Sequence, residues 1–551
     1  MSATGAGSPG DAAPVIHVAG ALGEALAPGA LATLDGAPLA RFLAERRWFG
    51  GKGSAPRAAR VAHVVPLDLA PPAALAVIEV AGAPGARPQR YQLPLVVRQV
   101  GAENGGAGGP RAVLAHVEAA AGTRALLFDA TEDRAFRRAL GAALARGASF
   151  ADARRAARWS LEPLNPVDAG EPGGAEMGDG ESRLIAAEQS NTSIVYGDRT
   201  ILKLFRRLEP GEHPDVEIGR YLASVPGFRN TPALLGVVRL DLTQSGEGEG
   251  RAVAGMLQRF VPGSRDAWAH ALARAGAFFA GREGADGFGA DAAELGRVTR
   301  ELHAVLAAGT AEAFAPVRAT PADVTRWTEA ARRAMIEALA LLAARVGDGA
   351  AAGERGAALA GPARRAAALV LERRDELAAL VDGAAAALRG DAGLRIRHHG
   401  DYHLGQVLRA PDSTFYVIDF EGEPSRPLTE RRERHSALRD VAGMVRSFAY
   451  AAAVGSTEAG AGGESGSGRA GDAARWEAAA RETFLGAYFA PASSASPAFL
   501  PATAGASGAL LALFELEKLF YELAYELNNR PAWTWVPLGG VARLLRTDAA
   551  G

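Results

Sequence analysis

Three polar side chains near residue 400 have types and spacing suited to phosphoryl transfer from a nucleotide. Asp401 follows His399-Gly400, Gln406 comes five positions after Asp401, and Asp419 ends the apolar run 415–418. A carboxylate can orient an acceptor hydroxyl and accept its proton late in the reaction. Amide and carboxylate oxygens are ligands that Mg²⁺ prefers, and the phosphates need that cation for charge neutralisation. We therefore predict that Asp401 is the base and that Gln406 and Asp419 hold Mg²⁺.

Glu421 and two histidines extend this set. Glu421 stands two residues beyond Asp419 on the same face of an extended segment, so it can reach the metal directly or through water. His399 and His403 raise the alternative of zinc, because imidazole is a common zinc ligand. The chain has no cysteine, and its acids are spaced for magnesium. We interpret His399 as a residue that braces the loop and His403 as a contact to substrate or phosphate.

Residues 182–260 form a strand-rich segment that can supply the nucleotide site. A polar turn is predicted at 189–193, a two-residue hairpin turn at Gly197-Asp198, and a strand at 200–205 that contains Lys203. The helix that follows carries Glu217. A strand lysine paired with a helix glutamate places the nucleotide phosphates in kinase-type folds. The competing interpretation of Lys203 is a residue on the solvent face of its strand.

Length and composition restrict the class of protein. The 551 residues exceed one compact core, so two to four domains or subdomains are expected. Lys and Arg number 60 against 62 Asp and Glu, a formal net charge of −2 that gives no reason to expect nucleic acid or a membrane surface as partner. The lack of cysteine fits a reducing cytoplasm. No apolar run is long enough to span a bilayer, and the first residues do not look like a secretory signal.

The order of predicted elements indicates an α+β chain in three parts. Strands and a helix form a small module over residues 31–150, more strands follow over 151–260, and residues 261–551 are mostly helical. Within the helical part, long helices are predicted at 321–346, 362–388 and 510–528, and flexible low-complexity loops at 457–473 and 490–508.

Taken together, these motifs resemble the bacterial maltokinases, within the aminoglycoside phosphotransferase branch of the eukaryotic-kinase-like superfamily. The segments that carry the resemblance are Phe42–Lys52, Leu202–Gly211, Asp215–Glu217, His399–Gln406, Ile418–Pro424, Leu438–Met444 and Glu526–Pro531. The similarity covers the chain from about residue 35 onward. It implies a two-lobed protein-kinase-like fold with an N-terminal cystatin-like cap subdomain and a mostly helical C-lobe.

The resemblance also implies an activity and roles for particular residues. The activity is transfer of phosphate from ATP to maltose, giving maltose 1-phosphate in the trehalose-to-α-glucan pathway of glycogen biosynthesis. An association with trehalose synthase is a family-level expectation. Carried over by position, Lys203 and Glu217 place the phosphates, and Gln258 and Phe260 lie where adenine meets the hinge. The place of the Gly-rich loop is taken by Ser190, Asn191, Thr192 and Ser193.

The sugar site is predicted at the end of the last long helix. A disaccharide needs carboxylate, amide and guanidinium groups for its hydroxyls and an aromatic ring for its apolar face. Such groups cluster at Tyr525, Glu526, Asn529, Arg530 and Trp533, and we add His403 and Arg426 to the predicted acceptor contacts. The competing interpretation is a capped helix with a packed tryptophan.

Two other functions stay open on the sequence alone. One is a kinase for another small acceptor, such as glucosamine or an aminoglycoside, although Arg426, Arg431 and Arg530 argue against a polycationic acceptor. The other is a non-catalytic kinase-like module that binds nucleotide or a partner enzyme. Loss of the base, the metal ligands or the lysine would favour it, and all are present.

Overall fold

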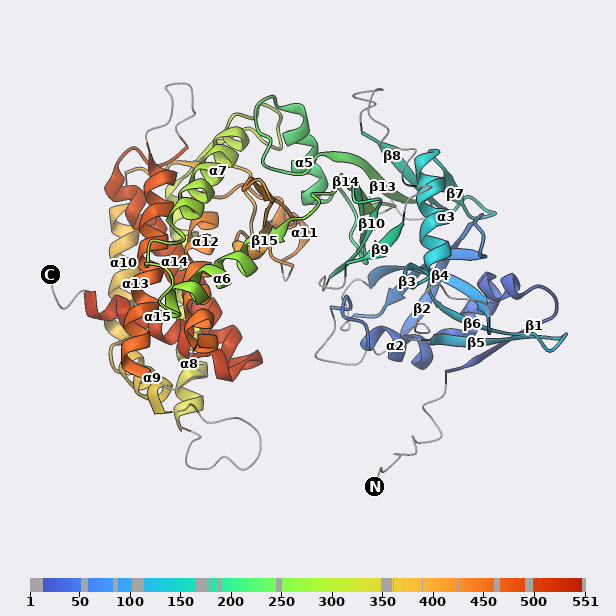
Figure 1. Ribbon diagram of the computed structural model, residues 1–551, viewed down its shortest axis with the longest axis horizontal. Helices are drawn as coiled ribbons and strands as arrows, with labels where there is room; N and C mark the ends of the chain where they lie inside the picture. The colour runs from blue at the N-terminus through green and yellow to red at the C-terminus, as the bar shows by residue number, and fades with distance from the viewer. Residues whose placement is uncertain are drawn as a thin grey trace. The chain divides into compact units, whose positions relative to one another are not determined.

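The chain forms two compact units in the computed structural model (Figure 1). The N-terminal unit comprises residues Met1–Ala223 and Pro232–Pro262, and the C-terminal unit comprises Ser224–Thr231 and Gly263–Gly551. The structure describes residues 13–50, 58–82, 88–101, 113–164, 177, 181–185, 190–243, 250–347, 359, 361–388, 390–424, 426–459, 466–490 and 499–547. Among the helices of these residues, none has both the length and the hydrophobicity needed to cross a bilayer. The three-part division drawn from the sequence stays a prediction.

The first sheet of the N-terminal unit has the strand order β1-β5-β6-β4-β3-β2, and β12 pairs with β4 beside this path. Its strands are β1 (Val15–Val18), β2 (Ala59–Leu67), β3 (Ala73–Val80), β4 (Gln89–Gln99), β5 (Val113–Ala119), β6 (Arg124–Asp129) and β12 (Arg207–Leu208). β2, β3 and β4 pair antiparallel in sequence order and so form a meander within the strand-containing module predicted over residues 31–150. β1 pairs with β5 in parallel.

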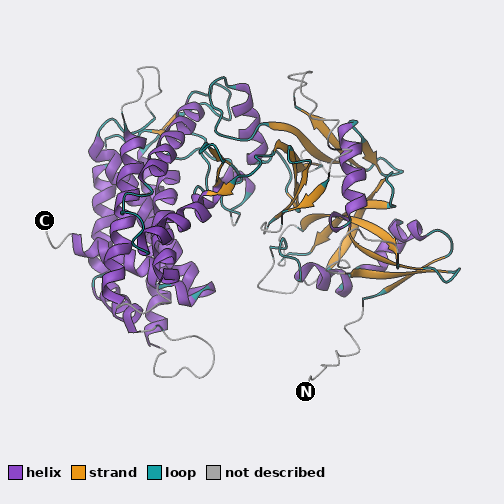
Figure 2. Ribbon diagram, viewed as in Figure 1, coloured by secondary structure: helices purple, strands orange, loops and turns teal. Residues whose placement is uncertain are grey.

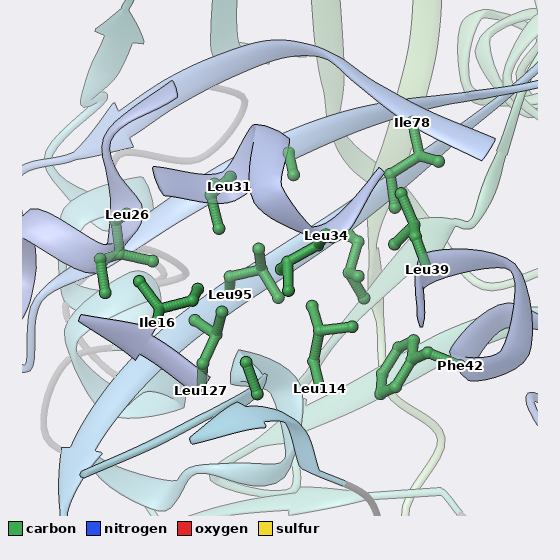
Figure 3. Packing of buried hydrophobic residues seen from close by; sticks show 14 of the residues in the cluster. Ile16, Leu26, Leu31, Leu34, Leu39, Phe42, Ile78, Leu95, Leu114 and Leu127 are labelled. Atoms are coloured by element: carbon green, nitrogen blue, oxygen red, sulfur yellow. The ribbon is translucent and has the colours of Figure 1, made fainter. Parts of the chain in front are cut away.

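One face of this sheet is covered by short helices. They are η1 (Leu22–Leu26), α1 (Pro28–Leu31), η2 (Ala32–Leu34) and α2 (Ala37–Ala44). Figure 3 shows Leu31, Leu39 and Phe42 of these helices facing Leu114 and Leu127 of the strands. Leu39, Phe42 and Leu43 recur at the helical spacing and are all buried, as their pattern predicts. Lys52, at the end of the segment Phe42–Lys52 that carries the family resemblance, lies outside the described residues.

The second sheet of the N-terminal unit has the order β7-β8-β13-β14-β11-β10-β9. Its strands are β7 (Ser149–Ala151), β8 (Ala157–Pro163), β9 (Ser182–Leu184), β10 (Asn191–Tyr196), β11 (Thr200–Phe205), β13 (Leu234–Leu242) and β14 (Arg251–Arg259). A core that includes Phe128, Trp159 and Leu202 joins this sheet to the first one and to helix α3 (Arg134–Ala145). A smaller core around Val216 and Met256 seats helix α5 (Pro214–Ser224) on the sheet.

The C-terminal unit is mostly helical (Figure 2). Its helices are α6 (Ala267–Phe279), α7 (Gly289–Ala307), α8 (Pro321–Gly347), α9 (Gly361–Glu372), α10 (Arg374–Ala387), α11 (Leu428–Arg431), α12 (Leu438–Ala459), α13 (Gly466–Phe489), α14 (Ala504–Asn529) and α15 (Trp535–Thr547). Short strands β15 (Arg265–Asp266), β18 (Val407–Arg409) and β19 (Phe415–Val417) form a small sheet, and β16 (Val317–Arg318) pairs with β17 (Leu394–Arg395).

Helix α14 lies at the centre of this packing, against α8, α10, α12 and α15. Its buried side chains follow the helical period at Leu513, Leu516, Phe520, Leu523 and Leu527. Burying each of them contributes about 1.5–3 kcal/mol. The amphipathic helix predicted at 510–528 is therefore confirmed.

Two predictions for the C-terminal unit are wrong. The single helix expected at 362–388 is interrupted at Arg373, which leaves the helical conformation and lets α9 pack on α15 while α10 packs on α14. The loops expected at 457–473 and 490–508 are partly helical, because α12, α13 and α14 reach into them. Alanine is a strong helix former, and tertiary packing outweighs the glycines in these stretches.

Candidate active site

Asp440 of α12 anchors the loop that carries Asp401. The Asp440 carboxylate accepts hydrogen bonds from the backbone N–H groups of His399, at 2.7 Å, and Gly400, at 2.9 Å. Its Oδ2 atom also lies 3.2 Å from His303 Nε2. Burial alone would raise the pKa of Asp440, but neighbouring histidines and the bond to His303 lower it well below its ordinary value. Asp440 therefore stays ionised and fixes the backbone on the N-terminal side of Asp401.

Gly400 supplies the sharp bend before Asp401. Its φ of 87° lies in the left-handed region, and a Cβ atom here would stand 3.1 Å from the Cα of Gly422. The close approach brings the loop of Asp401 against the segment that follows Asp419. Gly422 itself has a φ of 72°. The two glycines thus allow the loop of the predicted base, Asp401, to lie beside the segment that follows the predicted metal ligand Asp419.

Asp401 stands between two basic groups. Its Oδ1 lies 3.7 Å from Lys518 Nζ, and its Oδ2 lies 4.0 Å from His403 Nε2. His403 Nδ1 accepts the Gly405 N–H at 3.1 Å, so the proton of the neutral ring resides on Nε2, the atom nearest Asp401. Desolvation lowers the pKa of His403 and favours this neutral form. The arrangement leaves the Asp401 carboxylate positioned to accept a proton.

The predicted metal ligands gather at one end of the β18–β19 hairpin. Val407 pairs with Val417, and the Ile418 N–H donates to the Gln406 carbonyl at 3.0 Å, so Gln406 and Asp419 leave the hairpin side by side. Asp419 has a φ of 70°, an uncommon conformation for a residue with a side chain. A carboxylate oxygen of Asp419 lies within 4.8 Å of one of Glu421. This all-oxygen donor set fits Mg²⁺, and the three residues stay predictions as its ligands.

Lys518 of α14 is a site residue that the sequence analysis missed. Its ammonium lies 3.3 Å from Glu423 Oε1 as well as 3.7 Å from Asp401. Burial would raise the pKa of Glu423, but Lys518, Arg439 and Arg426 lower it to about 2. A lysine in an amphipathic helix is normally assigned to the solvent-facing side, so no local signal identified it.

The rotation of α14 about its axis is fixed by polar contacts with α12. Arg439 Nη2 pairs with Glu517 at 3.1 Å, and buried Arg446 pairs with Glu522 at 2.8 Å. The Lys518 side chain lies between these two glutamates along the helix. The pairs therefore hold it toward Asp401 rather than toward bulk solvent.

The predicted acceptor residues are in part engaged with one another. Arg426 Nε donates to Glu423 at 2.6 Å, and Glu526 is buried, paired with Arg530 at 2.6 Å and with the Tyr450 hydroxyl at 3.1 Å. The Asn529 amide donates to the Tyr525 carbonyl at 2.9 Å. The Arg530 guanidinium stacks on the rings of Tyr525 and Trp533, each 5.4 Å away. These contacts support the capped-helix interpretation. Binding of the acceptor sugar by these residues stays a prediction.

In the N-terminal unit, the buried ammonium of Lys203 forms an ion pair with Asp215 of α5. The Lys203 Nζ to Asp215 Oδ2 distance is 3.2 Å. Glu217, the partner predicted from the sequence, stands two residues further along the same helix. A strand lysine is thus paired with a helix carboxylate as predicted, but Asp215 is the partner that the geometry identifies. The contribution of Glu217 stays a prediction.

The predicted polar turn at 189–193 is wrong in part, because Asn191, Thr192 and Ser193 belong to β10. In the ladder with β11, Ser193 stands opposite Lys203, and its side chain is fully buried. Ser190 precedes the strand, and residues 186–189 lie outside the described part of the chain. The hairpin at Gly197-Asp198 is confirmed, since both residues have positive φ and join β10 to β11.

Arg206, directly after β11, joins the two sheets of this unit. Its buried guanidinium pairs with Asp129 of β6 at 2.7 Å, and its Nε donates to the Thr192 hydroxyl at 2.8 Å. A further bond runs to the Thr131 hydroxyl at 3.1 Å, and the Trp48 ring lies 5.0 Å from the guanidinium carbon. One cation therefore links the first sheet to the strand that precedes Lys203.

Gln258 and Phe260 lie at the end of the N-terminal unit, where the sequence predicts the adenine hinge. Gln258 pairs with Ile201 of β11, and the Phe260 N–H donates to the Arg199 carbonyl at 2.7 Å. The unit ends two residues after Phe260, at Pro262. The location suits a hinge, and adenine binding by these residues stays a prediction.

Buried neutral histidines make the stability of the C-terminal unit sensitive to mild acid. Burial lowers the pKa of His398 to about 4 and that of His435 well below its ordinary value. The unfolded chain takes up these protons below pH 6.5, whereas the folded chain does not do so until about pH 4. The free energy of unfolding should therefore fall continuously over this interval, with His398 alone accounting for about 3 kcal/mol.

Urea unfolding at pH 7.5, 6.0 and 5.0 measures this dependence. The His398→Gln variant should show a shallower decline than the wild type. His17→Gln is the matched control, since the His17 side chain is 74% exposed, and should leave the slope unchanged. Equal slopes in the wild type and the His398 variant would contradict the assignment.

Comparison with known proteins adds family information to this geometry. Residues 42–133 match the family model of the maltokinase N-terminal cap domain. The chain is 29% identical over 365 residues to a glucosamine kinase of Mycolicibacterium smegmatis, covering 66% of this chain and 79% of the relative. It is 28% identical over 362 residues to a glucosamine kinase of Streptacidiphilus jiangxiensis, covering 64% and 71%.

Solved structures of glucosamine kinase share the fold. One complex with glucosamine, ADP and inorganic phosphate aligns with a TM-score of 0.56 at 24% identity, over 92% of this chain and 99% of the other. A second crystal form gives a TM-score of 0.58 at the same identity and coverage. The chain therefore has a two-lobed kinase-like fold with an N-terminal cap. The chain is thus similar to the maltokinase N-terminal cap over residues 42–133 and to glucosamine kinases over most of its length.

Proposed function

We propose that this protein is an ATP-dependent sugar kinase whose acceptor is maltose, phosphorylated at its anomeric hydroxyl to give maltose 1-phosphate. The observation that carries the proposal is the geometry around Asp401. Asp440 anchors its loop through two backbone N–H bonds, and the oxygen donors Gln406, Asp419 and Glu421 lie in the adjoining hairpin segment. A base beside a magnesium-type donor set is what transfer of phosphate to a hydroxyl requires.

In the proposed reaction, Asp401 orients the acceptor hydroxyl and takes up its proton. The acceptor oxygen forms a bond to the γ-phosphorus as the bond from that phosphorus to the β-bridging oxygen breaks, and ADP leaves. Gln406, Asp419 and Glu421 would hold Mg²⁺, which neutralises phosphate charge when bound. Lys203, oriented by Asp215, would contact nucleotide phosphates.

Glucosamine is the second candidate acceptor, because the curated relatives are named glucosamine kinases. Two observations favour maltose. The family model that matches residues 42–133 is the maltokinase cap. In addition, the Lys518 ammonium stands 3.7 Å from the Asp401 carboxylate, and a cation next to the base disfavours an acceptor that carries its own ammonium group. Association with trehalose synthase stays a prediction.

A panel of acceptors with ATP and Mg²⁺ tests the proposal. We expect ADP release to be fastest with maltose, slower with glucose and glucosamine, and absent when the metal is chelated. Phosphorus–proton NMR of the product should place the phosphate on the anomeric carbon. Phosphate on an exocyclic hydroxyl or on an amine would refute the 1-kinase assignment, and preference for glucosamine would replace maltose with the second candidate.

A further inference from the structure

The segment Ser224–Thr231 leaves the N-terminal unit and packs within the C-terminal one. It connects α5 to β13, two elements of the N-terminal unit, yet its own contacts belong to the C-terminal unit. Its half-buried Asn230 is bonded to Phe415 of β19, which lies 185 residues further along the chain. This detour of the backbone brings one amide side chain to the strand that leads into Asp419, a predicted ligand of Mg²⁺.

Asn230 satisfies the outer edge of β19 in the manner of an added strand. β19 is an edge strand of the small sheet β15-β18-β19. The Asn230 carbonyl accepts the Val417 N–H at 2.7 Å, and the Asn230 side-chain amide donates to the Phe415 carbonyl at 2.8 Å. One residue thus provides both the acceptor and the donor that a neighbouring strand would provide.

The backbone between β19 and Asp419 is also held from other directions. The Ile418 N–H donates to the Gln406 carbonyl at 3.0 Å, and the Ile418 carbonyl lies 2.9 Å from His399 Nε2. Asp419 itself has a φ of 70°, a conformation that a residue with a side chain keeps only where its surroundings enforce it. Of the residues that enforce it here, Asn230 is the one most distant in sequence.

We propose that Asn230 is a positioning residue for the metal site, and that it holds Asp419 in the conformation that binds Mg²⁺ by fixing the outer edge of β19. This rests on the proposed kinase function, in which Asp419 holds the cation together with Gln406 and Glu421. Mg²⁺ demands a nearly ideal octahedral arrangement of oxygens, so a small displacement of one ligand weakens its binding. Asn230 acts through the backbone of β19 and not as a ligand.

The chemistry of asparagine suits this position. The Phe415 carbonyl needs a donor, and a neutral amide provides one without bringing a charge to the hairpin that carries Gln406. An aspartate has the same shape, but it would set a carboxylate against the carbonyl, two acceptors with no proton between them. Exchanging the donor for an acceptor should therefore do more harm than removing the side chain.

Metal binding by the full chain tests the proposal without turnover. Titration with Mn²⁺ in the presence of ADP, followed by electron paramagnetic resonance, gives the affinity for the cation. Asn230→Ala should weaken it about 3- to 10-fold, less than the roughly 10- to 100-fold typical for loss of a group bonded directly to a ligand. Asn230→Asp should weaken it further. Both variants keep the backbone carbonyl that accepts the Val417 N–H, so both should fold.

Amide hydrogen exchange of the metal-free chain is an independent measurement. Exchange at residues 415–420 should accelerate in both variants, because the outer edge of β19 is less firmly held. Thr243→Ala is the matched control, since the exposed Thr243 hydroxyl also donates to a distant backbone carbonyl, that of Arg155, at 3.2 Å. It should leave the metal affinity and the exchange unchanged.

Steady-state kinetics distinguishes positioning from a purely structural role. In Asn230→Ala, the Mg²⁺ concentration that gives half the maximal rate should rise by the same factor as the affinity falls, while the KM for the sugar stays within about twofold. A lower thermal midpoint with unchanged metal affinity and unchanged Mg²⁺ dependence would overturn the proposal. Asn230 would then only fasten its own segment to the C-terminal unit.

The failure of this proposal and the failure of the proposed function give different results. Sugar phosphorylation by the wild type, with equal Mn²⁺ affinities in the wild type and both variants, would overturn the positioning role and leave the kinase. A wild type that binds no Mn²⁺ with ADP would overturn both the positioning role and the metal site. If the wild type phosphorylated no sugar, the proposed function would be refuted, and the Mn²⁺ affinities and exchange rates would still decide the role of Asn230.

Discussion

The Asp401→Asn variant should turn over maltose about 10²- to 10⁴-fold more slowly than the wild type, because asparagine keeps the shape of the side chain but cannot accept the proton of the acceptor hydroxyl. The loop should remain in place, since its anchoring bonds run from the His399 and Gly400 backbone to Asp440. The measurement is kcat by ADP release, with the thermal unfolding midpoint recorded in parallel.

Asp412→Asn is the matched control for this variant. Asp412 lies in the exposed turn between β18 and β19, where its carboxylate accepts the Thr414 N–H at 3.0 Å. The same change of charge, in the same hairpin region, should leave kcat within about twofold of the wild type, as expected for a surface substitution. Full activity in Asp401→Asn would show that Asp401 is not the base.

The Asp440→Asn variant should lose both stability and activity. Asparagine cannot accept from both the His399 and the Gly400 N–H groups with a charged oxygen, and a buried donor left without its partner costs about 1–3 kcal/mol. The thermal midpoint should therefore drop, and amide hydrogen exchange at residues 399–405 should accelerate. The turnover number should also fall, because the backbone that carries Asp401 is no longer held.

Asp382→Asn provides the comparison for this second prediction. Its carboxylate pairs with Arg332 on the exposed surface of α8 and α10, where an ion pair contributes about 0–1 kcal/mol. We expect little change in midpoint or turnover for this variant. If Asp440→Asn behaved like Asp382→Asn in all three measurements, Asp440 would not be the anchor of the loop.

The parts of the site that lie close together in sequence could be predicted, because local geometry brings them together. Asp401, Gln406 and Asp419 belong to one loop and one hairpin, and the pairing of β18 with β19 is enough to place Gln406 beside Asp419. The strand lysine Lys203 was also predicted, since a charged residue in an apolar strand is conspicuous. Its partner in the structure is Asp215, and the contribution of the predicted partner Glu217 stays a prediction.

Contacts between distant segments could not be predicted. Lys518 reaches Asp401 across more than a hundred residues, and only the packing of α14 on α12 directs it there. In the sequence, Asp440 is an acidic residue in the first turn of a helix, a common position that does not indicate a role in the site. No glycine or proline marks the interruption at Arg373; on either side of it, α9 packs on α15 and α10 on α14, although both also contact α8. Such features depend on the assembled core rather than on local propensity.

The buried guanidinium of Arg206 limits how the cap can be removed or exchanged. Its carboxylate partner, Asp129, belongs to the first sheet, whereas Arg206 itself follows β11 of the second. Cutting the cap away would remove the carboxylate partner of Arg206 and would expose apolar residues of the core that the two sheets share. The cap is therefore not an independent module. A chimera that exchanges it between relatives would have to keep Asp129 and Thr131 as partners of Arg206, or replace all three residues together.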